Sequence, residues 1–234
     1  FIVYIIIMLD KLVEKSIKIS LFVQIVTTLI SLDGLTMDLS KNDLILKDIL
    51  KIETIVQVVE GAFYVWVMYA LKDMNKMTPR RYIDWMITTP VMLLSTIIYF
   101  KYNEYKEKGI SKPFTLEEFY DENKDNIHKI VFYNGFMLFF GYMGETNVID
   151  KRISIPIGFF FFYQSFNLIY EEYAVHSEMG QTLFKVLLFL WALYGVSAML
   201  PVKEKNLCYN VLDIFAKNFY GLYIYYRIRE LRLR

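Results

Sequence analysis

Two apolar stretches of this sequence each carry a pair of ionisable residues that could do chemistry together. Arg81 and Asp84 lie near the start of one stretch, and Asp213 and Lys217 lie in the other. Asp213 and Lys217 are four residues apart, so a helix would place both on one face. The two cations and two carboxylates sum to zero, which is the balance that a buried charge cluster requires.

An amine in such a cluster could react with an aldehyde. A buried, isolated lysine tends to lose its proton and becomes a nucleophile, and the imine that it forms can bind the proton again. Carboxylates placed as Asp84 and Asp213 are would stabilise a protonated imine on Lys217. The alternative interpretation is a purely structural network of ion pairs.

The elements that must position these residues are seven apolar runs. The chain has 234 residues, 56% of them hydrophobic and 18% aromatic, with a mean hydropathy of +0.32. A soluble domain is rarely so apolar, and spans of roughly 20 residues each would use nearly the whole chain. We therefore predict an all-α integral membrane protein, a bundle of seven transmembrane helices. The predicted spans are residues 16–32, 48–71, 79–100, 127–143, 153–170, 182–200 and 207–228.

The two ends of the chain differ from the spans. Residues 1–13 are very apolar but are interrupted by Asp10 and Lys11, which predicts an N-terminal interfacial segment on the membrane surface. Residues 14–230 form the predicted seven-helix domain, and residues 227–234 a basic cytoplasmic tail. By the positive-inside rule, this tail places the C-terminus in the cytoplasm and the N-terminus outside, in a multi-pass protein. The charges form no basic patch, so we expect no nucleic acid.

Four motifs, in order along the chain, resemble the microbial (type 1) rhodopsins. RYIDWMITTP at 81–90 resembles the third helix of bacteriorhodopsin and proteorhodopsin. FGYMGE at 140–145 resembles the end of the fourth helix of proteorhodopsin. WALY at 191–194 is similar to the sixth helix, and NLCYN at 206–210 begins a stretch similar to the seventh. The resemblance extends over about residues 51–228.

The resemblance implies a retinal cofactor, all-trans and bound covalently to Lys217 as a protonated Schiff base. Asp84 and Asp213 would be its counterions, and Arg81 the neighbouring cation. Aromatic faces make an apolar slot that also suits a delocalised cation. Neither enzymatic activity nor a metal site is expected. The other residues implied to hold retinal are Trp85, Thr88, Thr89, Phe162, Trp191 and Tyr194.

One position departs from the pattern of outward proton pumps in this family. Asp84, Thr88 and Ser95 form the motif of the third helix. In those pumps, the position of Ser95 carries a carboxylic acid that returns a proton to the Schiff base. A serine hydroxyl cannot supply a proton near neutral pH, so this departure indicates slow reprotonation.

Polar residues recur at i, i+4, i+7 and i+11 on three of the predicted spans, so each set lies on one helical face. These three helices are neighbours in such a bundle, and glutamates would bias a hydrated path toward cations. The alternative is ordinary hydrogen bonding between helices, which fits the mid-span Glu60 poorly. The sets are Ser20, Gln24, Thr27 and Ser31; Glu53, Gln57, Glu60 and Tyr64; and Asn206, Asn210, Asp213 and Lys217.

Scattered polar positions also resemble the viral rhodopsins of large algal viruses, a branch near proteorhodopsin in which one group resembles light-gated cation channels. We therefore predict a light-gated cation channel. The alternatives are a light-driven outward proton pump that lacks a carboxylate proton donor, and a light sensor coupled to a partner protein. Expected partners are the lipid bilayer, cations or protons, and further copies of the chain in a homo-oligomer. The predicted ion pathway comprises Ser20, Gln24, Glu53, Gln57, Glu60, Ser95, Asn210 and Asn218.

Overall fold

The computed structural model describes residues 2–69 and 76–232, with the side chains of residues 2–7 left aside. The described residues are helical throughout their ordered elements and include no strand. The last three elements follow one another without a gap and make one continuous helix. The predicted bundle of seven helices is therefore confirmed. The elements are α1 (Ile2–Thr36), η1 (Lys41–Asp43), α2 (Ile45–Met68), α3 (Met77–Glu107), α4 (Leu116–Glu145), α5 (Lys151–Glu172), η3 (Ala174–His176), α6 (Glu178–Ser197), α7 (Val202–Asp213), η4 (Ile214–Asn218) and α8 (Phe219–Arg232).

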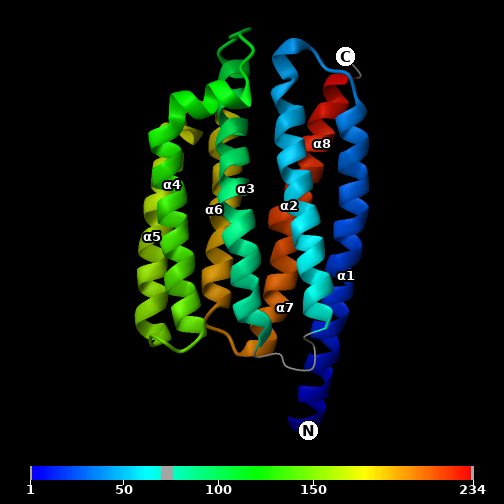
Figure 1. Ribbon diagram of the computed structural model, residues 1–234, viewed down its shortest axis with the longest axis vertical. Helices are drawn as coiled ribbons and strands as arrows, with labels where there is room; N and C mark the ends of the chain where they lie inside the picture. The colour runs from blue at the N-terminus through cyan, green and yellow to red at the C-terminus, as the bar shows by residue number, and fades with distance from the viewer. Residues whose placement is uncertain (1, 70–75, 233–234) are drawn as a thin grey trace.

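The helices stand side by side with their axes roughly parallel, and the termini lie at opposite ends of the bundle (Figure 1). At one side α1 packs on α2, α7 and α8, and at the other side α4 packs on α5. Helices α3 and α6 lie between these two groups. Helix α3 also contacts both α2 and α4, so its side chains reach the interior from a central position.

The first helix extends across the predicted boundary at residue 13. Helix α1 runs without a break through Ile2–Thr36, and an interfacial segment at residues 1–13 stays a prediction. Thirty-five residues at 1.5 Å each span about 52 Å, which exceeds the roughly 30 Å of a bilayer core. Figure 1 accordingly shows α1 projecting past the other helices at its N-terminal end. An ion pair of 2.6 Å between Asp10 and Lys203 ties this end to α7.

The fourth helix begins eleven residues before the predicted span, at Leu116. Its start carries a capping box, in which the Thr115 hydroxyl accepts from the Glu118 backbone amide and the Glu118 carboxylate accepts from the Thr115 amide. The Thr-x-x-Glu spacing was visible in the sequence, but the charged residues that follow indicated a loop. The basic tail is likewise helical as far as Arg232, while residues 233–234 lie outside the described residues.

Four helical segments of the described chain are long and apolar enough to cross a membrane by length and composition alone: Met8–Thr36, Met77–Glu107, Lys151–His176 and Glu178–Ser197. Helix α2 and the α7–α8 helix carry ionisable residues along their length, including Glu53, Glu60, Asp213 and Lys217. All four of those side chains are buried inside the bundle. The charged interior therefore lies on α2 and the α7–α8 helix, which fall short in composition, and on α3, which contributes the buried Arg81 and Asp84.

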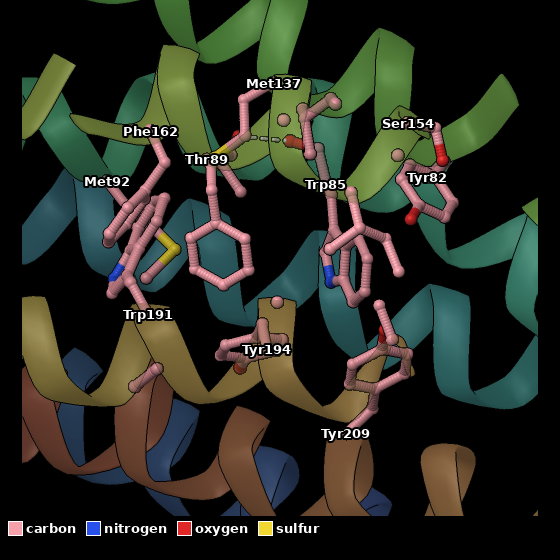
Figure 2. Close-up of a pocket in the computed structure, with 18 of the residues that line it drawn as sticks. Tyr82, Trp85, Thr89, Met92, Met137, Ser154, Phe162, Trp191, Tyr194 and Tyr209 are labelled. Atoms are coloured by element: carbon pink, nitrogen blue, oxygen red, sulfur yellow. Dashed lines mark hydrogen bonds between the residues drawn. The ribbon is translucent and has the colours of Figure 1, made fainter. Parts of the chain in front are cut away.

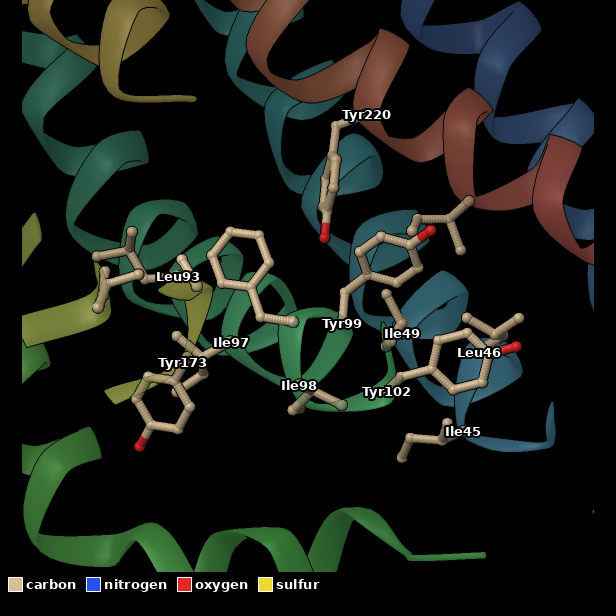
Figure 3. Packing of buried hydrophobic residues seen from close by; sticks show 14 of the residues in the cluster. Ile45, Leu46, Ile49, Leu93, Ile97, Ile98, Tyr99, Tyr102, Tyr173 and Tyr220 are labelled. Atoms are coloured by element: carbon tan, nitrogen blue, oxygen red, sulfur yellow. The ribbon is translucent and has the colours of Figure 1, made fainter. Parts of the chain in front are cut away.

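The largest apolar cluster fills the end of the bundle near the C-terminus. Figure 3 shows Tyr99 and Tyr102 of α3 beside Leu46 and Ile49 of α2, with Tyr220 of α8 above them. The rings of Tyr99 and Tyr102 stack with centroids 6.0 Å apart. This cluster closes that end of the interior with close-packed side chains.

Candidate functional site

Lys217 lies at the centre of the bundle and faces three carboxyl groups. Its Nζ is 2.8 Å from Asp84 Oδ2, 3.2 Å from Glu60 Oε1 and 3.8 Å from Asp213 Oδ1. The side chain is 2% exposed, so these groups meet in a desolvated interior. The predicted pairing of Lys217 with Asp84 and Asp213 is thus present as geometry, and Glu60 is an addition.

A widened turn of helix holds the lysine in this position. Element η4, Ile214–Asn218, is a π-helical turn in which the Phe219 amide donates to the Ile214 carbonyl. The Asn218 side chain donates to the Asp213 carbonyl at 3.5 Å and accepts from the Thr27 hydroxyl at 2.6 Å. Single π turns occur frequently at functional sites, because they redirect a side chain without breaking the helix. No feature of the sequence predicted this turn.

Arg81 is the second buried cation, one helical turn from Asp84. Its NH1 donates to Asp213 Oδ2 at 3.0 Å, and its Nε donates to Asn206 Oδ1 at 3.1 Å. Its NH2 donates to Asn210 Oδ1. Every nitrogen of this fully buried guanidinium therefore has an acceptor, which is the condition for burying a charge at tolerable cost.

Asp213 is held by two tyrosine hydroxyls in addition to Arg81. Tyr64 donates to its Oδ2 at 2.6 Å, and Tyr194 donates to its Oδ1 at 2.8 Å. Short hydrogen bonds to a carboxylate are among the stronger ones in proteins. The predicted role of Tyr194 was to pack on retinal, and the structure adds this contact through its hydroxyl.

Glu60 changes the charge count of the cluster. The sequence predicted two cations and two carboxyl groups around Lys217, whereas the structure places a third carboxyl group there. Gln24 donates to Glu60 Oε2, so this carboxyl group joins Lys217 to α1. With two cations and three carboxyl groups, the buried cluster has a net charge of zero only if one carboxyl group carries a proton. Sequence reasoning assigned Glu60 only to the pathway, because spacing within one helix does not report distances between helices.

An apolar cavity adjoins Lys217 on the side of α5 and α6. Its empty space amounts to about 800 Å³, with the open space at its mouth included. Figure 2 shows its lining side chains projecting from α3, α5 and α6 toward the same space. Lys217 and the predicted Trp85, Thr89, Phe162, Trp191 and Tyr194 all line this cavity, as do Met92, Met137, Phe159 and Gly195, which sequence reasoning missed.

The donor set and shape of this cavity fit retinal. The wall is aromatic and apolar, while the one amine in it, Lys217, sits beside carboxyl groups. Trp85 and Tyr194 pack edge to face with centroids 5.6 Å apart. At Gly195 an added Cβ would lie 2.5 Å from the Phe159 ring, so a larger residue there would push that ring. A polyene aldehyde matches this long, apolar lining, and its carbonyl carbon matches the amine.

Two of the predicted retinal-binding threonines differ in position. Thr89 lines the cavity and accepts a hydrogen bond of 2.8 Å from Asn134 of α4. Thr88 is buried and its hydroxyl donates to the Asp84 carbonyl at 3.0 Å, but it is not among the residues that line the cavity. Its position one turn from Asp84 places it beside that residue.

The three predicted polar stripes meet between α1, α2 and the α7–α8 helix. Ser20 donates to the Asn210 carbonyl at 3.0 Å, and the Ser31 hydroxyl lies 3.4 Å from Gln57 Oε1. Together with the Gln24–Glu60 and Thr27–Asn218 contacts, these contacts connect the stripe on α1 to α2 and to the α7–α8 helix. We call this set the polar column, and all of its members are buried. It consists of Ser20, Gln24, Thr27, Ser31, Glu53, Gln57, Glu60, Tyr64, Asn210 and Asn218.

Ser95 forms a hydrogen bond with a carboxyl group, a contact that the sequence did not predict. Its hydroxyl donates to Glu53 Oε1 of α2, and both side chains are fully buried. The third helix lacks a carboxyl group at this position, as the sequence indicated, but the second helix supplies one at the same place. The inference of slow reprotonation from Ser95 therefore loses its main support.

Known proteins resemble this chain in sequence and in fold. A family model described as bacteriorhodopsin-like protein matches residues 15–231. The crystal structure of viral rhodopsin OLPVRII is similar with a TM-score of 0.78 and 27% identity over 94% of this chain and 98% of that one. Blue light-absorbing proteorhodopsin from Med12 is similar with a TM-score of 0.72 and 17% identity, over 93% and 97% of the two chains. Bromide-bound halorhodopsin from Halobacterium salinarum is similar with a TM-score of 0.71 and 14% identity, over 97% of this chain and 96% of that one. No curated protein matches.

Proposed function

Because this chain belongs to the family of bacteriorhodopsin-like proteins, multi-pass membrane proteins that bind retinal through a Schiff base to a lysine, we propose that Lys217 is that lysine. The observation that carries this assignment is that Lys217 lines the aromatic cavity while its Nζ faces Asp84 at 2.8 Å. Asp84 and Asp213 act as its counterions, and Arg81 fixes Asp213 in place.

Replacement of the lysine tests the assignment. Lys217→Ala removes the only amine that lines the cavity among the described residues, so the protein should form no visible absorption band when retinal is added. The matched control is Lys205→Ala, which removes another fully buried lysine, one paired with Glu145 at 2.7 Å. The control should keep the band. A coloured Lys217→Ala protein would refute the assignment.

We further propose that the protein is a light-gated cation channel whose path follows the polar column. Bound retinal supplies light absorption and a change of shape on isomerisation. The supporting observation is that Glu60 contacts both Lys217 and Gln24, so a change of charge or position at Lys217 acts directly on the column. Asp84, the nearest carboxylate, is placed to accept the proton of Lys217 Nζ. The acidic residues Glu53 and Glu60 favour cations over anions.

A second candidate, an outward proton pump, is favoured by one contact. Ser95 and Glu53 together place a carboxyl group where the third helix has none. In that case Glu53 would return a proton toward Lys217 after Asp84 has accepted one. The light-driven current would then be carried by protons alone and driven by the photocycle.

Two matched variants separate these candidates, since each removes one carboxylate of the same helix. In a channel, Glu60→Gln alters the relative permeability of cations and, because Glu60 Oε1 is 3.2 Å from Lys217, also shifts the absorption maximum. Glu53→Gln in a channel changes current amplitude without slowing the recovery of the dark state. In a pump, Glu53→Gln slows that recovery, and an added weak acid restores it. Flash photolysis measures the recovery of the dark state, and current recording measures the amplitude and the relative permeability.

Orientation and assembly are also proposals. The C-terminal end of the bundle bears Lys101 and Lys106 of α3, Lys108 directly after α3, and Arg229 and Arg232 of α8. This excess of cations supports a cytoplasmic C-terminus and an extracellular N-terminus. We also propose that the chain forms a homo-oligomer in the membrane, which crosslinking in native membranes would detect.

A further inference from the structure

A groove on the outer face of the bundle combines an apolar floor with a cation at one end, and shares only Tyr82 with the lining of the retinal cavity. It lies over α3 between α2 and α4, near the end at which α3 begins, and encloses about 1130 Å³ including its open side. Trp66 of α2 and Tyr142 of α4 form its flanks. Its other lining residues are Lys76, Pro79, Arg80, Tyr82, Ile83, Met86 and Ile87.

The spacing of these residues makes one stripe along α3. Arg80, Ile83 and Ile87 follow at i, i+3 and i+7, which is one face of a helix. Ile83, Met86 and Ile87 are each more than half exposed. At 1.5 Å per residue, Ile87 lies about 10 Å farther along α3 than Arg80. A cation near the helix end and an apolar strip deeper in the bilayer match a lipid headgroup and its acyl chain.

Arg80 is held in place without an anionic partner in the described part of the chain. Its guanidinium carbon lies 4.8 Å from the centroid of the Trp66 ring. No carboxylate among the described residues forms an ion pair with it, unlike Arg81 with Asp213 or Arg152 with Asp150. The contact with the indole holds the cation at the groove, and an arginine can bind a phosphate with two donors at once.

The floor of the groove is shaped to remain open. Tyr82 is buried beneath it and packs on Tyr142 with ring centroids 5.8 Å apart. At Gly141 an added Cβ would lie 2.8 Å from the Tyr82 hydroxyl, so glycine lets α4 approach α3 closely at this level. The aromatic side chains of Trp66 and Tyr142 line the groove on either side of α3. An ordinary lipid-facing surface would have neither this hollow nor the stacked cation.

We propose that this groove binds one phospholipid with an anionic headgroup, with its phosphate on Arg80 and one acyl chain along Ile83, Met86 and Ile87. The site is distinct from the proposed ion pathway, since none of its lining residues belongs to the polar column. The occupant is a lipid and not a second copy of the chain, because the lining combines the Arg80 guanidinium with the apolar side chains of Ile83, Met86 and Ile87 in one stripe.

Native mass spectrometry of the retinal-loaded protein, released from nanodiscs with equal amounts of phosphatidylglycerol and phosphatidylcholine, tests the proposal. The wild type should retain one phosphatidylglycerol in preference to phosphatidylcholine. Arg80→Gln should reduce that preference about five-fold, the contribution of one cation at an anionic lipid surface. The matched control is Arg152→Gln, at the same end of the bundle, where hydrogen bonds from the Arg152 side chain and amide lower the pKa of Asp150 to about 2. The control should retain the preference.

A second variant keeps the proposal testable if Arg80→Gln is poorly folded. Met86→Trp fills the slot while Arg80 is intact, so it should abolish retention of the lipid without changing the visible absorption band. Inorganic phosphate at millimolar concentration should displace no lipid. Equal retention by wild type and Arg80→Gln would overturn the proposal. So would a change of oligomeric state in Arg80→Gln with no change in bound lipid, since the groove would then be a contact between copies.

Discussion

The two halves of the buried polar interior, on either side of Lys217, are built differently. Around Arg81, the polar atoms of Asp213, Asn206 and Asn210 each have a protein partner, and the network closes on itself. Toward the C-terminal end the pairing is incomplete. Buried side-chain atoms that accept or donate no hydrogen bond there and beside Lys217 are Gln24 Oε1, Glu53 Oε2, Gln57 Nε2, Asp84 Oδ1 and Tyr220 Oη.

This difference indicates which half is fixed and which can change. A fully satisfied network of charged hydrogen bonds holds its members in one arrangement. Buried polar atoms without a partner are costly in an apolar interior, and water or a rearrangement of side chains relieves the cost. We therefore expect the Arg81 half to stay in place during the response to light, while the half that contains Gln57 and Glu53 hydrates.

The largest expected effect breaks the fixed half. Arg81→Gln leaves Asp213 buried beside Lys217 without its second cation. Removing one partner of a buried ion pair costs about 3–5 kcal/mol, so the free energy of unfolding should fall by that amount. Chemical unfolding in detergent micelles, followed by loss of the visible band, measures it. The exposed Arg152→Gln is the control and should leave the unfolding free energy unchanged, and a stable Arg81→Gln protein would contradict a fixed network.

A smaller effect compares one amide from each half. Asn206→Leu leaves Arg81 Nε and the Thr78 hydroxyl without their partner and should cost about 1–3 kcal/mol. Gln57→Met removes an amide whose Nε2 has no protein partner and whose Oε1 is 3.4 Å from the Ser31 hydroxyl. The free energy of unfolding of Gln57→Met should change by less than about 0.5 kcal/mol, while the photocurrent of this variant should fall. Equal destabilisation by the two variants would remove the distinction between the halves.

The sequence predicted those parts of the site that lie within one helix. Asp213 and Lys217, four residues apart, share a face in the structure, although the turn that contains Lys217 is π-helical. The polar stripes were predicted from the same kind of spacing, and they do meet between neighbouring helices. Seven spans were predicted from apolar runs, because each crossing requires a stretch of apolar residues.

Contacts between helices could not be predicted in this way. Glu60 was expected in a pathway, and its Oε1 also lies 3.2 Å from Lys217 Nζ. This contact could not be predicted, because the axial position of α2 relative to the α7–α8 helix depends on packing. Glu53 meets Ser95 for the same reason. The start of α4 was missed because its first turns lie among charged residues, where hydropathy indicates a loop and only the Thr115–Glu118 capping box marks a helix.

Voltage-clamp recording from illuminated cells that express the wild-type protein tests the central claim most directly. The account predicts a photocurrent that reverses sign when the voltage crosses the equilibrium potential of the permeant cation, and that shifts with its external concentration. In the proposed channel, the polar column would conduct in either direction once water enters the half around Gln57, whose Nε2 has no protein partner. A photocurrent that stays outward at all voltages would contradict the channel and indicate a pump that uses Glu53.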